Sequence, residues 1–237
     1  MNPGCTKPST LCAVRESFPS VVSMMESLIS KSVRKNVLDE ALSPRLSLIG
    51  LEQVSDYFWV SDFSNGIARV FQYLLLKGGQ STFSWGVCLD FLPLVRSGKL
   101  KYAKTRKGAV AHLYQWTKEY GSSFLGGGLE GGVCSEWGEA NARRSINALL
   151  TKYEGSISDW YETASSLEGL IGLAEFQVAQ RAPYSLHSPD PEYVLAFLLA
   201  KSGAKAEALK SLTCYLKRDR DLRHSEQLRE LISEIGA

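Results

Sequence analysis

The chain has 237 residues, 44% of them hydrophobic and 22% charged, which is typical of a globular protein with one substantial core and a smaller appendage. Its formal net charge is +2, so the overall charge indicates neither nucleic acid nor a membrane surface as a partner. Any such partner has to be argued from local patterns.

The first twenty residues and the cysteines indicate a cytoplasmic protein. Residues 1–20 contain three prolines and several charges, and lack the uninterrupted apolar core of a secretory signal. The best apolar run, residues 193–200, is far shorter than the roughly 20 residues of a membrane span. The five cysteines are scattered without a CxxC or Cys/His cluster, so neither a disulfide framework nor a zinc site is indicated. We expect no metal and no cofactor.

The first expected element is a helix over residues 21–42, which Pro44 interrupts. A last turn over residues 45–50 then ends at Gly50, a residue suited to the left-handed C-terminal position. The helix is predicted by apolar residues at three- and four-residue steps: Val21, Val22, Met25, Leu28, Ile29, Val33, Val37, Ala41 and Leu42.

From Tyr57 the pattern changes to that of strands. Residues 57–60 and 67–76 flank Asn65-Gly66, a hairpin signal, and Gly78-Gly79 leads into a third strand over residues 81–91. That strand places Phe83, Trp85, Val87 and Leu89 on one face. A fourth strand is expected over residues 109–117, with Val110, His112, Tyr114 and Trp116 on one face, and the seven glycines of residues 121–138 then predict an irregular loop.

Helical periodicity returns over residues 142–153 and 157–176, and residues 183–191 resemble a linker. Helices are expected over residues 191–199, 204–216 and 222–235. The first two are joined at Gly203 and resemble a single tetratricopeptide-type helical hairpin. We therefore predict a flexible segment (1–19), a core domain (20–182) and a helical subdomain (190–237). The fold class is α+β, an antiparallel sheet of about four strands packed with helices.

Four segments resemble a bacterial family, domain of unknown function 4304: "VLDEALSPRLSLIGLE", "YFWVS…IARVFQYLLLK", "TFSWGVCLDF" and "ANARRSINALLTKYEGSISDWYETASSLEGLI". The similarity covers residues 30–180 and rests on pattern and spacing. It implies a sheet with helices and a small stand-alone bacterial protein, and it supplies no catalytic residues. The glycine-rich loop and the C-terminal helices depart from the family.

A basic stretch over residues 96–107 contains no acid and has Tyr102 within it. It could follow a phosphate backbone by counterion release, which indicates a nucleic-acid-linked or phage-defence function. The other interpretation is a solvated loop between strands. Its basic residues are Arg96, Lys99, Lys101, Lys104, Arg106 and Lys107.

Motifs of catalysis are missing from the sequence. The three histidines stand far apart, there is no GxSxG string, and the glycine-rich loop lacks the Lys-Ser/Thr of a P-loop. Cys88 is expected to be a small core residue. Asp159 and Glu162 lie three apart on a helix and, with His112, leave open a cryptic hydrolase, although such charges usually serve a solvated helix face.

Large aromatic residues framed by acids favour a protein interface, because they supply desolvated contact area. Core packing is the alternative for the tryptophans. The leading interpretation is a non-enzymatic binding protein of the immunity or antitoxin type that neutralises a cognate toxin or effector by direct binding; nucleic-acid binding and the hydrolase are the alternatives. The expected partner-binding residues are Glu130, Glu136, Trp137, Glu139, Asp159, Trp160 and Glu162.

Overall fold

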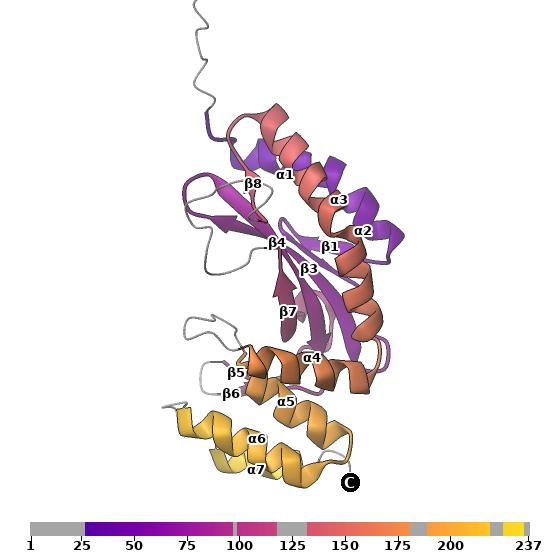
Figure 1. Ribbon diagram of the computed structural model, residues 1–237, viewed down its shortest axis with the longest axis vertical. Helices are drawn as coiled ribbons and strands as arrows, with labels where there is room; N and C mark the ends of the chain where they lie inside the picture. The colour runs from indigo at the N-terminus through magenta and orange to yellow at the C-terminus, as the bar shows by residue number, and fades with distance from the viewer. Residues whose placement is uncertain (1–26, 97–98, 118–131, 181–188, 219–224, 235–237) are drawn as a thin grey trace, which may run out of the picture.

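The chain folds as an α+β protein in which helices pack on an antiparallel sheet, with a helical region at the C-terminal end (Figure 1). The structure, a computed structural model, describes residues 27–96, 99–117, 132–180, 189–218 and 225–234. The helices are α1 (Lys31–Ala41), α2 (Ser43–Leu48), α3 (Glu139–Thr163), α4 (Leu167–Ala179), α5 (Pro191–Lys201), α6 (Lys205–Arg218) and α7 (Ser225–Glu234), with a 3-10 turn η1 (Arg106–Gly108). The strands are β1 (Glu52–Ser55), β2 (Phe58–Val60), β3 (Ile67–Leu76), β4 (Gln80–Leu89), β5 (Leu94–Arg96), β6 (Lys99–Lys101), β7 (Leu113–Trp116) and β8 (Cys134–Ser135).

The long hairpin of β3 and β4 forms the middle of a six-stranded sheet with the order β1-β2-β3-β4-β7, and β8 also pairs with β4. The predicted turn at Asn65-Gly66 is confirmed: both residues have positive φ, 51° and 81°, as a two-residue hairpin loop requires. In the middle of β4, Gly86 faces β7, where a Cβ atom would lie 2.2 Å from the carbonyl oxygen of Leu113. A glycine is needed there because the two backbones approach closely.

The opening helix and the fourth strand are both shorter than predicted. Within the described residues, the first helix begins at Lys31 after the N-cap Ser30, and Leu28 and Ile29 precede it. They are not helical because the N–H of Ile29 donates to the carbonyl of Glu136. The fourth strand is β7, which starts at Leu113, since residues 103–111 turn and pack over the sheet. The edge strand β1 was not predicted.

The two faces of the sheet have different covers. Helices α1, α2 and α3 lie on one face (Figure 1), above the fully buried rings of Trp59, Phe71, Phe83 and Trp85. On the other face a smaller apolar layer, including Cys88, is covered by the alanines of residues 103–111. Cys88 is therefore a buried core residue, as expected.

The C-terminal helices share the core of the sheet. The helical periodicity predicted over residues 142–153 and 157–176 is confirmed, but the helices divide elsewhere: α3 runs unbroken for 25 residues, and the chain turns at Ala164 before α4. The two helices predicted around Gly203, which has φ of 89°, are confirmed. Helix α5 is buried on nearly all sides, and the hydroxyl of Tyr193 donates to the carbonyl of Pro93 at 2.6 Å. In the described part of the chain, no helix has the length and apolar character needed to cross a membrane.

Candidate functional site

An exposed tryptophan marks one end of the sheet. Trp137 lies between β8 and α3, pairs with Leu28 in an isolated bridge, and donates from its indole Nε1 to the carbonyl of Gly78 at 3.2 Å. Trp137 is 46% exposed and Leu28 is 48% exposed. We call Leu28, Trp137, Glu139 and the Gly78–Gly79 turn the Trp137 surface. It presents two apolar side chains that are about half exposed, and the indole is held by its hydrogen bond to Gly78.

A buried polar network lies directly behind the Trp137 surface. The guanidinium of Arg34 donates to both carboxylate oxygens of Glu136, at 2.8 and 2.6 Å, and the hydroxyl of Tyr73 donates to Glu136 at 2.9 Å. Ser81 donates in turn to the hydroxyl of Tyr73. The hydrogen bond to Glu136 raises the pKa of Arg34, whereas burial, together with the charge of Glu136, raises the pKa of Tyr73. The network ties α1, β3 and β4 to the residue that precedes Trp137.

The structure divides the predicted partner-binding residues. Glu136 is 2% exposed and Trp160 is 5% exposed, so the prediction that they lie on a binding surface is wrong. Glu136 is buried because it pairs with Arg34, and Trp160 packs in the core, edge-on to Tyr161. Glu139 is exposed beside Trp137 and pairs with Arg143 at 3.2 Å, while Glu130 lies outside the described residues.

Asp159 and Glu162 are exposed, but they lie toward the other end of α3. At 1.5 Å per residue they are roughly 30 to 35 Å along the helix from Glu139, which lies beside Trp137. The structure therefore places the predicted residues on two separate surfaces, one around Trp137 and one around Glu162.

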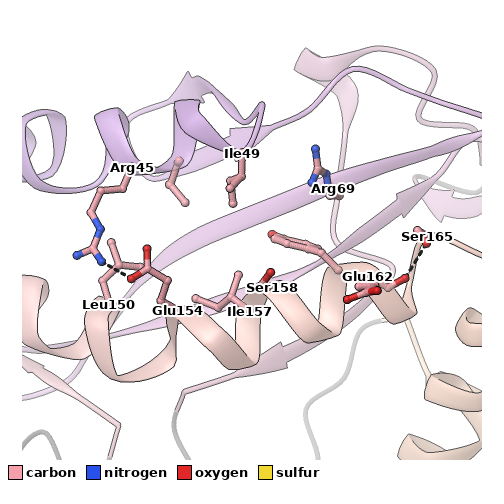
Figure 2. A pocket seen from close by; sticks show the side chains of 11 residues that line it. Arg45, Ile49, Arg69, Leu150, Glu154, Ile157, Ser158, Glu162 and Ser165 are labelled. Carbon is pink, nitrogen blue, oxygen red and sulfur yellow. Dashed lines mark hydrogen bonds and ion pairs between the residues drawn. The ribbon is translucent and has the colours of Figure 1, made fainter.

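Glu162 borders a cavity of about 560 Å³ between α2, β3 and α3 (Figure 2). We call this cavity the arginine pocket. Four aliphatic side chains line it together with polar and charged ones, and both arginines approach it from the sheet and α2 side. The lining residues are Arg45, Leu46, Ile49, Arg69, Leu150, Glu154, Ile157, Ser158, Tyr161, Glu162 and Ser165.

The two arginines of the pocket have different partners. Arg45 donates to Glu154 at 2.7 Å and to Thr151 at 3.2 Å. Arg69 lies over the ring of Tyr161, 5.6 Å from its centroid, and among the described residues no carboxylate lies within ion-pair distance of it. The hydroxyl of Tyr161 donates to the carbonyl of Val70, and burial raises the pKa of Tyr161. The pocket thus offers one half-buried cation, Arg69, that no carboxylate of the described residues neutralises.

Sequence reasoning missed both arginines. Arg45 falls in the predicted last turn of the first helix and Arg69 in a predicted strand, and neither belongs to a recognisable motif. One signal was available: Arg69 shares the inward-facing side of β3 with Ile67, Phe71 and Tyr73, and a lone charge on a buried face needs an explanation.

The basic stretch lies in β5, β6 and the turn that follows them. Arg106 pairs with Glu52 at 2.5 Å and with Asp62 at 3.5 Å, two acids from distant parts of the sequence. Lys104 lies over the ring of Tyr102, at 5.8 Å from the centroid. Lys101, Lys104 and Lys107 are exposed, and the side chains of Arg96 and Lys99 lie outside the described part.

The structure does not bring the three hydrolase candidates together. His112 is 1% exposed, and its Nδ1 accepts a hydrogen bond from the backbone N–H of Leu89, while Asp159 and Glu162 are exposed on α3. Burial raises the pKa of the Cys88 thiol to about 11 and raises that of Cys134 as well, so both stay protonated at neutral pH. Within the described ranges there is no group of three or more His, Cys, Asp or Glu that could hold a metal ion.

Comparison of the chain with family models, with curated proteins and with solved structures finds no match. The resemblance to the family of unknown function therefore stays a prediction. A sheet packed with helices is common to many unrelated proteins, so the observed fold does not identify the family.

Proposed function

We propose that this chain is a binding protein that holds a cognate protein partner against the Trp137 surface, in the manner of an immunity or antitoxin protein that neutralises a toxin by contact. One observation carries the proposal: Trp137 is half exposed although it is anchored by a hydrogen bond and lies on a buried polar network. Tryptophan is the residue type most enriched among interface hot spots.

The rigidity of the support favours binding. A side chain that is already held in place loses little conformational freedom when a partner arrives, so more of the contact energy remains as affinity. Gly79 contributes to this fixed geometry: it has φ of 69°, and a Cβ atom there would lie 2.5 Å from Leu28 and 2.6 Å from Trp137. The exposed carboxylate of Glu139 at the rim suits a partner with basic side chains, where it would chiefly influence the association rate.

Nucleic acid is the alternative partner, and the exposed Lys101, Lys104 and Lys107 are what favours it. The ion pairs of Arg106 with Glu52 and Asp62 count against it, because they place acids beside the basic stretch. Neutralising the three lysines should abolish binding and flatten its salt dependence if nucleic acid is the partner, and should leave neutralisation of a toxin unchanged if our proposal is right.

The proposal can be tested by co-expression. The products of genes adjacent to this one in the source genome are expressed singly in a host, and those that stop growth are expressed again together with the chain. We expect the wild type to restore growth against one of them, and Trp137→Ala to lose this protection while it still accumulates as a folded protein. Phe176→Ala is the matched control, since Phe176 is an aromatic on α4 that is 62% exposed. Failure to relieve any toxic neighbour, or equal protection by the Trp137→Ala variant, would contradict the proposal.

A further inference from the structure

We propose that the arginine pocket binds a small carboxylate that has an apolar body, with Arg69 receiving the carboxylate. The pocket begins near Leu150, which is roughly 20 Å along α3 from the Trp137 surface at 1.5 Å per residue. The inference is therefore independent of the proposed protein partner and concerns a second binding site.

The position of Arg69 supplies the anion-binding group. Its guanidinium is half-buried, reaches the pocket from the central strand β3, and has no carboxylate partner among the described residues. The ring of Tyr161 lies beside it, with its centroid 5.6 Å from the guanidinium carbon, and Tyr161 is itself held by the hydrogen bond to Val70. A planar guanidinium matches the two oxygens of a carboxylate, and partial burial strengthens that contact.

The apolar part of the ligand has its own wall. Leu46 and Ile49 belong to the α2 side of the pocket, and Leu150 and Ile157 belong to α3. Figure 2 shows Ile49 across the pocket from Leu150 and Ile157. Ile49 is 39% exposed, so apolar surface remains in contact with water at the pocket. The cavity of about 560 Å³ falls within the usual size of small-molecule sites, about 300–1,000 Å³.

The remaining charges of the pocket favour a single negative charge on the ligand. Arg45 is already paired with Glu154, and Glu162 adds a second carboxylate to the lining. A phosphate would bring nearly two charges to one available cation and would face both glutamates, whereas a carboxylate neutralises Arg69 alone. We infer a monocarboxylate in preference to a phosphate ester.

Binding can be measured by calorimetry on the full chain with octanoate as the probe. Octanol, which has the same chain without the charge, and octyl phosphate are the comparison probes. The variants are Arg69→Gln and Ile49→Asp, the second of which puts a negative charge at a partly exposed position of the pocket. Arg144→Gln is the matched control, because Arg144 is an exposed arginine of α3 that does not line this pocket.

We expect saturable binding of octanoate to the wild type and to Arg144→Gln, and at least about tenfold weaker binding to Arg69→Gln, as for the loss of a hydrogen bond to a charged group. Octanol and octyl phosphate should also bind at least about tenfold more weakly to the wild type. Should Arg69→Gln not fold, Ile49→Asp carries the test, with the same expected loss. The inference is overturned if octanoate does not bind the wild type, if octanol or octyl phosphate binds as tightly, or if the folded pocket variants bind like the control.

Discussion

Replacing Arg34 by methionine should strongly destabilise the protein. The side chain of Arg34 is 10% exposed and that of Glu136 is 3% exposed. The substitution removes both donors of a bidentate ion pair and leaves a buried carboxylate with only the hydroxyl of Tyr73. Breaking a buried pair in this way costs about 3–5 kcal/mol, because the remaining charge is no longer compensated.

Urea denaturation at pH 7 measures this cost as the change in unfolding free energy. The double variant Arg34→Met with Glu136→Leu should be less destabilised than Arg34→Met alone, since it leaves no buried charge. Arg143→Met is the matched control: Arg143 pairs with Glu40 and Glu139 at the surface, and its loss should change stability little. An unfolding free energy for Arg34→Met within about 1 kcal/mol of the wild type would refute this prediction. So would a double variant whose loss of unfolding free energy equals the sum of the losses of Arg34→Met and Glu136→Leu measured singly.

Three further predictions concern the core. Gly86→Ala should destabilise the protein by about 1–3 kcal/mol, because the added Cβ meets the backbone of β7. Gly155→Ala is the control and should not destabilise it, since the space around Gly155 is open. Equal losses of unfolding free energy for the two variants in urea denaturation would contradict this. Because burial raises the pKa of Cys88 to about 11 from 9.0, the unfolded thiol loses its proton first, and stability should fall as pH rises from 9 to 11. In Cys88→Ala the unfolding free energy should therefore decline less steeply between pH 9 and pH 11, with a slope smaller than that of the wild type by about 1.4 kcal/mol per pH unit. The same slope in both proteins would exclude a contribution of the Cys88 thiol. Deleting residues 190–237 should lower the melting temperature of residues 1–189 measured by calorimetry, because Tyr193 and Phe197 belong to the core that the helices share with the sheet. An unchanged melting temperature would show that the helices fold independently.

The central sheet could be predicted because its signals are local. Asn65-Gly66 specifies a tight turn by backbone conformation alone, and the alternation around Trp85 identifies the face of β4 that packs in the larger core. The start of α1 could not be predicted in the same way. Leu28 and Ile29 continue the helical spacing, but a backbone hydrogen bond to Glu136, more than a hundred positions away, holds this segment extended. The edge strand β1 has no fully buried residue, so it has no alternating pattern to detect.

The candidate sites were predicted less well because they depend on contacts distant in sequence. Glu136 looked like one of a series of surface acids, and only its pairing with Arg34, 102 positions away, places it in the interior. The arginine pocket joins α2, β3 and α3, and no local pattern links Arg45 or Arg69 to Glu162. Trp137 and Trp160 both follow from the same pattern, a large aromatic framed by acids, and only the fold separates them: Trp137 is 46% exposed and Trp160 is 5% exposed.

The most direct test of the account is a calorimetric titration of the purified toxic partner into the wild type, Trp137→Ala and Phe176→Ala, with folding of each variant checked by its melting curve. The account predicts that Trp137→Ala loses about 2 kcal/mol of binding free energy, roughly 30-fold in affinity, as expected for a tryptophan hot spot, while Phe176→Ala binds like the wild type. Wild-type affinity for a folded Trp137→Ala variant would contradict the assignment of the Trp137 surface as the binding site.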